Sequence, residues 1–209
     1  MKFIVDAVKT AIIRVVHDVA VALNALSKGK ISPNGVTWFG FLMHLPIAYF
    51  IIDGQLVKAG ALLIFFGLFD KLDGELARLQ KRVTNNGGFL DASTDRFKEV
   101  ILYGGIAWYF AQGSHPEYAA IAAVACGASI CVSYVKAKGE AVVASLEKKI
   151  PYPELNKMFS GGLFPFEIRM TVLIVGLLFN QLLWAVAAIA IFSAITALNR
   201  MIIISRRIS

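Results

Sequence analysis

The sequence predicts an all-α, polytopic membrane protein with six transmembrane helices, preceded by an amphipathic helix that lies in the membrane interface. Of its 209 residues, 57% are hydrophobic, and the mean hydropathy of +0.67 is too high for an ordinary soluble domain. Long apolar runs alternate with short polar segments, as expected for helices that cross a bilayer repeatedly. Four aspartates interrupt this pattern within one stretch, and burying a carboxylate at the edge of a bilayer costs free energy unless it faces a wet cavity, a partner or a metal.

The first part of the chain predicts a helix that lies on the membrane and does not cross it. Residues 2–26 place charged side chains at helical spacing against Ile, Val and Leu. Packing of this helix on another protein chain is the alternative. Residues 27–33 then break the helix, and Pro33 suits the first turn of the next one. We therefore expect a juxtamembrane helix and linker over residues 1–32 and a six-helix transmembrane domain over residues 33–209.

The six spans follow from the apolar runs and from the breakers between them. The fourth is expected to be a long helix whose charged later half leaves the bilayer, and Pro151 and Pro153 begin the longest connection after it. Cys126 and Cys131 lie in that helix five residues apart and are interpreted as packing residues. The spans are expected near residues 34–52, 56–79, 88–112, 119–149, 164–179 and 182–204.

Basic residues indicate how the protein is oriented. With six spans, one side of the membrane collects nine of them and the other side has Lys58. The positive-inside rule then predicts that both termini and the four aspartates face the cytoplasm. The protein itself is expected in the inner, cytoplasmic membrane. The formal net charge of +7 is spread over short connecting segments, which favours anionic lipids and phosphate-bearing substrates over nucleic acid as partners. The nine basic residues on the side predicted to be cytoplasmic are Lys28, Lys30, Lys81, Arg82, Lys148, Lys149, Lys157, Arg206 and Arg207.

The four aspartates fall into two pairs on consecutive helices. Asp70 and Asp73 share one helical face with Gly74 and Ala77, because residues three, four and seven apart lie on the same side. Asp91 and Asp95 are one turn apart on the next helix. The segment between these helices, residues 81–88, is basic and rich in Asn and Gly. A short turn there makes the helices antiparallel and brings the two pairs together.

Four converging carboxylates predict a metal site. They cannot all remain ionised unless divalent cations neutralise them, and oxygen-only ligands select Mg²⁺, Mn²⁺ or Ca²⁺. Gly74 and Ala77 leave room for a bulky phosphate-bearing ligand beside the carboxylates, and Arg78 adds a cation for a phosphate oxygen. The alternative is a solvated helical hairpin whose charges simply lie outside the membrane.

Read in order, the stretch has the pattern Asp70-x2-Asp73-Gly74-x2-Ala77-Arg78-x8-Gly87-x3-Asp91-x3-Asp95. This pattern resembles the full signature of the CDP-alcohol phosphotransferase family, with no departure at any defined position. The resemblance implies an enzyme in which an alcohol attacks the β-phosphorus of a CDP-linked lipid such as CDP-diacylglycerol and releases CMP. It also implies a two-metal site that holds Mg²⁺ or Mn²⁺.

The resemblance further assigns roles to individual residues. It places Asp70, Asp73 and Asp91 on the metals and makes Asp95 a ligand or near-ligand and the general base, so that Asp91 and Asp95 are the catalytic pair. The segment that contains Asn34 and Thr37 resembles the start of the family's first membrane helix, near the nucleotide. These two residues equally suit an N-cap and a first-turn hydroxyl. The expected binding residues for the CDP-lipid are thus Asn34, Thr37, Gly74, Ala77, Arg78 and Gly87.

Residues of the fourth and fifth spans indicate the acceptor. The sequence SYVKAKGE, which contains Ser133, Lys136 and Lys138, resembles a stretch of the branch that transfers inositol phosphate in bacteria and archaea. In that branch such residues and an arginine from the fifth span bind the acceptor's phosphate, and Arg169 is the candidate arginine. Inositol phosphate is the favoured acceptor, and glycerol 3-phosphate, serine or inositol is the alternative. Lys138 stands where the family has an arginine, which is a departure from the inositol-phosphate pattern. The three cations alternatively snorkel to lipid headgroups.

Two further expectations concern assembly and function class. A homodimer is expected from the family resemblance. A protein of a different class, a non-catalytic ion-binding or transport protein, would place its carboxylates near the middle of the bilayer, often in repeat-related broken helices. Here they gather toward one face and the chain has no internal repeat, which favours chemistry at the interface. The sequence leaves open the preferred metal and whether the donor lipid is acyl or isoprenoid.

Overall fold

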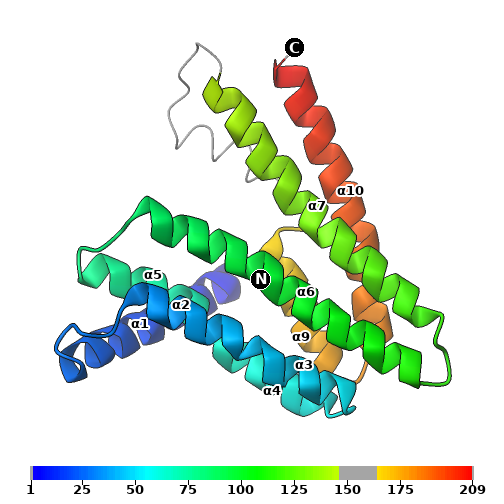
Figure 1. The fold of residues 1–209 in the computed structure, drawn as a ribbon, viewed down its shortest axis with the longest axis horizontal. Helices are drawn as coiled ribbons and strands as arrows, with labels where there is room; N and C mark the ends of the chain where they lie inside the picture. Colours follow the sequence, from blue (N-terminus) through cyan, green and yellow to red (C-terminus); the bar gives the residue numbers. More distant parts are fainter. Residues whose placement is uncertain (1, 146–163, 209) are drawn as a thin grey trace. The chain divides into compact units, whose positions relative to one another are not determined.

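The computed structural model describes residues 2–145 and 164–208, and all of the regular secondary structure in those residues is helical, which confirms the all-α class (Figure 1). The predicted end of the fourth span at residue 149 and the connection at Pro151 and Pro153 lie outside the described residues. The helices are α1 (Lys2–Leu26), α2 (Pro33–Leu42), α3 (His44–Ile52), α4 (Leu56–Gly67), α5 (Phe69–Leu79), α6 (Asn85–Gln112), α7 (Tyr118–Ser145), α9 (Phe166–Leu178) and α10 (Leu182–Ile208).

Three helical stretches within the described residues are long and apolar enough to cross a membrane: Pro33–Ile52, Tyr118–Val143 and Leu182–Arg206. The other expected spans differ from these in length or charge. Helices α4 and α9 have 12 and 13 residues, which is short for a bilayer core. Helices α5 and α6 carry the charged residues of the signature. The count of six spans therefore stays a prediction.

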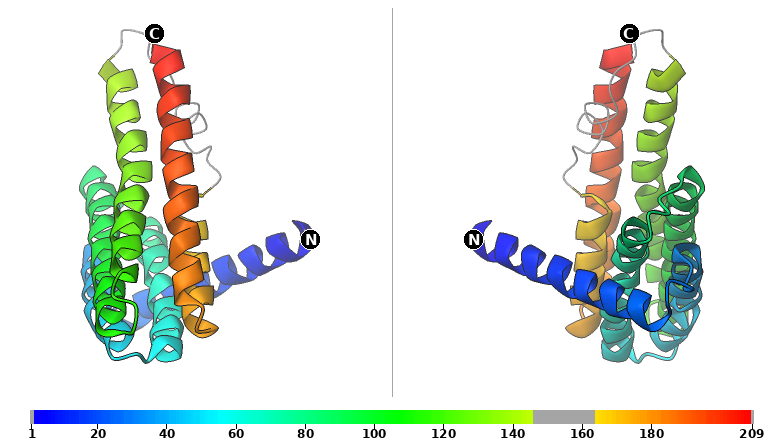
Figure 2. Two further views of the ribbon diagram at one scale, coloured as in Figure 1. Left: turned by 90° about the vertical axis from the view of Figure 1, so that its right-hand side faces the viewer. Right: turned by 90° about the vertical axis from the view of Figure 1, so that its left-hand side faces the viewer.

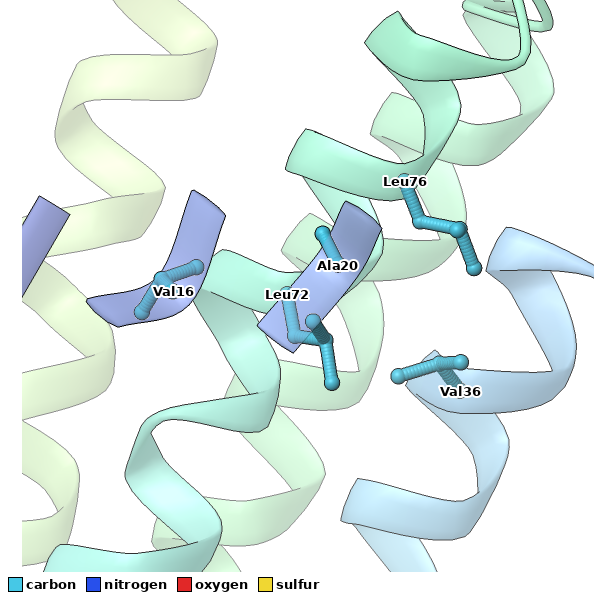
Figure 3. Close-up of a cluster of buried hydrophobic side chains, with 5 residues drawn as sticks. All are labelled: Val16, Ala20, Val36, Leu72 and Leu76. Carbon is cyan, nitrogen blue, oxygen red and sulfur yellow. The ribbon is translucent and has the colours of Figure 1, made fainter. Parts of the chain in front are cut away.

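The chain divides into two compact units, residues 1–47 with 62–98 and residues 48–61 with 99–209. In the first unit, α5 packs against α1 and α2. Their contact is the hydrophobic cluster of Val16 and Ala20 from α1, Val36 from α2, and Leu72 and Leu76 from α5 (Figure 3). This cluster positions α5, which carries the first pair of aspartates.

The exposed side of α1 bears on its predicted place in the interface. Ile13, Val15 and Val19 are about half exposed, although they belong to the same helix as the buried Val16 and Ala20. Apolar residues on both sides of a helix suit a surface that faces lipid on one side and protein on the other. The interfacial position itself stays a prediction.

In the second unit, α7 and α10 lie side by side along much of their length (Figures 1 and 2), and α10 also packs on α9. The helices α9 and α10 are joined by a tight turn at Asn180, which has φ +54°. Close to this turn a Cβ added to Gly176 would lie 2.3 Å from the Cβ of Ala185. Glycine therefore allows the two helices to approach at this point.

We expect Gly176→Ala to destabilise the protein by about 1–3 kcal/mol, because the added methyl group overlaps Ala185 and the two helices must separate. Thermal unfolding of the purified protein in detergent would measure the change. The matched control is Gly127→Ala on α7, where an added Cβ meets nothing within 4 Å. An unchanged melting temperature for Gly176→Ala would contradict the close approach of α9 and α10.

Candidate active site

The signature helices α5 and α6 are joined by a short turn, as predicted from the basic, Asn/Gly-rich segment. Lys81 has φ +53° in this turn, and the N–H of Arg82 donates to the carbonyl of Ala77 at 2.8 Å. Helix α6 begins at Asn85, earlier than the expected residue 88. The reason is Thr84, whose Oγ1 accepts a hydrogen bond from the N–H of Gly87 at 3.0 Å and so satisfies the first turn.

Asp73 is buried and fixed by two hydrogen bonds. Its Oδ2 accepts from Oγ1 of Thr37 at 2.6 Å, and its Oδ1 accepts from the N–H of Gly74 at 2.6 Å. Thr37 comes from α2, so this contact ties the first candidate membrane span to α5. The hydroxyl of Thr37 also lies 3.2 Å from the carbonyl of Pro33. The N-cap of α2 is Ser32, so the alternative of Asn34 as the N-cap is wrong, because proline at the first helical position places the N-cap two residues earlier.

Asp70 and Asp95 are joined by a lysine that the sequence analysis did not single out. Nζ of Lys98 donates to Oδ1 of Asp70 at 2.6 Å and to Oδ1 of Asp95 at 3.1 Å, and its side chain is only 2% exposed. Arg96 lies 3.7 Å from the other oxygen of Asp95. The available signal was the spacing, because Asp95 and Lys98 are three residues apart and share a helical face.

A cavity of about 190 Å³ lies beside these groups, within the first unit. All six expected donor-binding residues line it together with Asp73 and Asp91, whereas Asp70 and Asp95 do not. Two of its lining residues lie close to Gly87, where an added Cβ would be 3.3 Å from Oγ1 of Thr84 and 3.5 Å from Oδ1 of Asn34. The lining residues are Pro33, Asn34, Thr37, Asp73, Gly74, Ala77, Arg78, Arg82, Val83, Thr84, Gly87, Gly88 and Asp91.

Arg78 is one of the two arginines that line this cavity. Its Nε and one terminal nitrogen donate to Oε2 of Glu75 at 3.0 and 2.6 Å, and its side chain is 65% exposed. Oε1 of Glu75 is also hydrogen-bonded to Nδ1 of His17 on α1, at 2.8 Å. The arginine is therefore oriented by its neighbour on α5, with its charge open to solvent and to a phosphate.

The four signature aspartates supply donor atoms of the type that a divalent metal binds. Asp70, Asp73, Asp91 and Asp95 supply only carboxylate oxygens, which are the ligands of Mg²⁺ and Mn²⁺. Among the described residues, no three His, Cys, Asp or Glu side chains converge closely enough to hold an ion. The ammonium group of Lys98 contacts Asp70 and Asp95 and compensates their negative charge.

The expected acceptor residues lie in the second unit. Arg169 of α9 is fully buried; its NH2 donates to Oε1 and Oε2 of Glu99 at 3.1 and 3.4 Å, and its NH1 to the carbonyl of Phe164 at 3.1 Å. Such burial argues against snorkelling of this arginine. Lys136 lies 3.8 Å from Glu140 on the same helix, α7.

Ser133 and Lys138 also lie on α7, the first partly buried and the second exposed. A further cation, Arg200 of α10, was not predicted: it is buried, and its NH1 donates to the carbonyl of Val132 at 3.0 Å. Arg169 and Glu140 are close enough to Arg200 to act on it electrostatically. The second unit thus contains the buried charges of Glu99, Arg169 and Arg200, and α7 adds the half-buried Lys136 and Glu140.

The chain matches known proteins over most of its length. The family model described as CDP-alcohol phosphatidyltransferase matches residues 30–197. The chain is similar to the phosphatidylinositol phosphate synthase of Corynebacterium glutamicum, with 32% identity over 183 residues that cover 82% of this chain and 78% of that protein.

Two solved structures of the phosphatidylinositol phosphate synthase of Mycobacterium tuberculosis have a similar fold. The structure with CDP-DAG bound has a TM-score of 0.77 and 24% identity, over 91% of this chain and 94% of that one. The structure in complex with manganese and citrate has a TM-score of 0.76 and 23% identity, over 91% and 88% of the two chains. At 24% and 23% identity, this similarity establishes the fold of the chain.

Proposed function

Because the chain belongs to the CDP-alcohol phosphatidyltransferase family of membrane enzymes in phospholipid biosynthesis, we propose that it transfers the phosphatidyl group of CDP-diacylglycerol to a small phosphorylated alcohol. Inositol phosphate is the favoured acceptor, and glycerol 3-phosphate is the alternative. The observation that carries the proposal is the cavity of the first unit, which eight residues of the expected donor and metal sites line together.

The donor's diphosphate fits this cavity by charge and by shape. Gly74, Ala77 and Gly87 leave space beside the backbone, and Arg78, held by Glu75, adds a cation to the lining. A volume of about 190 Å³ suits part of the donor, the diphosphate and its nearest groups, while the lipid chains remain in the membrane. Thr37 and the N–H of Gly74 hold Asp73 in place for this ligand.

Asp70, Asp73, Asp91 and Asp95 would hold the divalent cations, in agreement with the manganese found with the related synthase. When bound, two such ions neutralise the diphosphate and align the attacking and leaving oxygens. In the reaction the acceptor's hydroxyl oxygen forms a bond to the β-phosphorus, and the bond from that phosphorus to the oxygen of CMP breaks. Asp95 takes the proton of the hydroxyl.

A phosphorylated acceptor is favoured by the buried cations of the second unit. Among the described residues, Nε of Arg169 is a buried donor that has no hydrogen-bond partner, so this arginine retains a donor for a ligand even while Glu99 holds it. Lys136 and Ser133 are the accompanying residues on α7, and Arg200 is a further candidate. A neutral alcohol such as serine or inositol would offer no negative charge to pair with these cations.

The location and assembly of the enzyme belong to the same proposal. The apolar helices support an integral membrane protein. We expect the cavity and both termini to face the cytoplasm, because the basic connecting segments gather on that side. We also expect a homodimer, as the family resemblance implies.

The decisive experiment measures CMP release by the purified protein in detergent, with CDP-diacylglycerol and Mg²⁺ or Mn²⁺. Inositol phosphate, glycerol 3-phosphate, serine and inositol are added one at a time, and a parallel reaction contains a chelator. We expect release with inositol phosphate and none with the chelator. Release with a neutral alcohol alone would keep the aspartate site and overturn the proposed acceptor residues.

A further inference from the structure

Lys98 is a buried cation placed inside the set of carboxylates that the family resemblance assigns to metal binding. Its ammonium contacts Asp70 of α5 and Asp95 of α6 at 2.6 and 3.1 Å, and its side chain is 2% exposed. Burial of an ammonium group is unfavourable unless carboxylates or other acceptors surround it. Lys98 is therefore stable at this position only because these two aspartates pair with it.

The same two carboxylates cannot serve the lysine and a metal ion independently. A positive charge a few ångströms from a metal site repels the incoming cation strongly, because the site is buried and poorly screened by water. Two divalent cations would by themselves neutralise the charge of the four aspartates. The ammonium of Lys98 would then be a positive charge in excess.

We propose that Lys98 is an internal counter-cation that competes with divalent metal ions at this site. In the metal-free enzyme it holds Asp70 and Asp95 together and so prevents their mutual repulsion. When metal binds, the excess positive charge lowers the affinity for the metal and increases the attraction for an anionic diphosphate. Lys98 is thus a positioning residue, acting through the two carboxylates. The proposed function supplies the identity of the diphosphate, whereas the competition with metal does not depend on it.

The test replaces the charge and measures metal binding without substrate. Mn²⁺ binding to the purified protein would be followed by electron paramagnetic resonance of the free ion for wild type, Lys98→Met and Lys98→Arg. We expect Lys98→Met to bind Mn²⁺ at least about tenfold more tightly, equivalent to about 1.4 kcal/mol. Lys98→Arg keeps the charge and is expected to stay close to wild type.

The matched control is Lys71→Met, which removes a lysine next to Asp70 that is exposed to solvent. Its effect on Mn²⁺ affinity is expected to be less than about twofold, because exposed charges are screened. An equal gain in both Met variants would mean that net charge, and not the buried contact, sets the affinity, and would overturn the proposal. Unchanged or weaker binding by folded Lys98→Met would overturn it as well.

Stability gives a second and independent readout. Without metal, in a chelator, Lys98→Met should melt at a lower temperature than wild type, because Asp70 and Asp95 then repel each other. Added Mn²⁺ should raise its melting temperature more than that of wild type. If Lys98→Met does not fold, Lys98→Gln provides the same comparison, since its amide still donates a hydrogen bond without a charge. An equal rise in the neutral variant and in wild type would contradict the competition.

These readouts separate this inference from the proposed function. Absence of CMP release with every acceptor, together with tighter Mn²⁺ binding by Lys98→Met, would overturn the proposed reaction and leave the counter-cation in place. Normal CMP release by the wild-type enzyme, together with unchanged Mn²⁺ affinity in Lys98→Met, would keep the proposed reaction and overturn the counter-cation.

Discussion

Asp95→Asn is expected to lower the rate of CMP release by about a thousandfold, with little change in the binding of CDP-diacylglycerol. An asparagine amide cannot accept the proton of the attacking hydroxyl, and general-base catalysis contributes about 10²- to 10⁴-fold. Asp95 does not line the cavity proposed for the diphosphate, so donor binding should persist. The measurement is kcat together with the dissociation constant of the donor.

The control for this variant is Asp53→Asn, an equivalent change in the other unit of the chain. Asp53 lies in the exposed turn between α3 and α4 and accepts a hydrogen bond from Gln55. It should keep full activity. A fully active Asp95→Asn enzyme would refute the role of Asp95, and a variant that no longer binds the donor would assign Asp95 to binding and not to proton transfer.

Helical periodicity predicted much of the fold, since apolar patterns determine which residues a helix buries. The bounds of α1 match the expected helix over residues 2–26, and α10 begins at the expected Leu182. Two expected helices are instead divided, at Met43 and Leu68. Both divisions had a local signal in the sequence. Pro46 has no N–H to donate to the carbonyl of Leu42, and Gly67 weakens the helix before Leu68.

The candidate site was predictable only where its contacts are local. Signature residues about one helical turn apart share a helical face, and Asp73, Gly74 and Ala77 accordingly line the cavity together, whereas Asp70 and Asp95 do not line it. Lys98 has a local partner in Asp95, but the other carboxylate partners of the buried Lys98 and Arg169 are distant in the sequence. Lys98 and Asp70 are 28 residues apart, and Arg169 and Glu99 are 70 residues apart. Such pairs depend on how helices pack, and a single sequence carries no signal for them.

Glu99→Gln is expected to cost about 3–5 kcal/mol of stability, the largest effect on folding that we predict. Glu99 and Arg169 are both fully buried, and the glutamate's carboxylate compensates the arginine's charge. The glutamine would leave the guanidinium buried without a counter-charge. Unfolding of the detergent-solubilised protein by SDS or by heat would measure the loss. Glu117→Gln is the control, since this glutamate is exposed and pairs with His115 at the surface.

The double variant Glu99→Gln/Arg169→Met separates the two roles of the arginine. Removal of both charges takes away the unpaired cation, so most of the lost stability should return. The acceptor site would still lack Arg169, and the KM for inositol phosphate should remain high although the protein is folded. A double variant with normal acceptor KM would show that Glu99 and Arg169 form a structural pair alone. A stable double variant with a raised KM would mean that Glu99 holds in place a cation that the protein needs for its substrate.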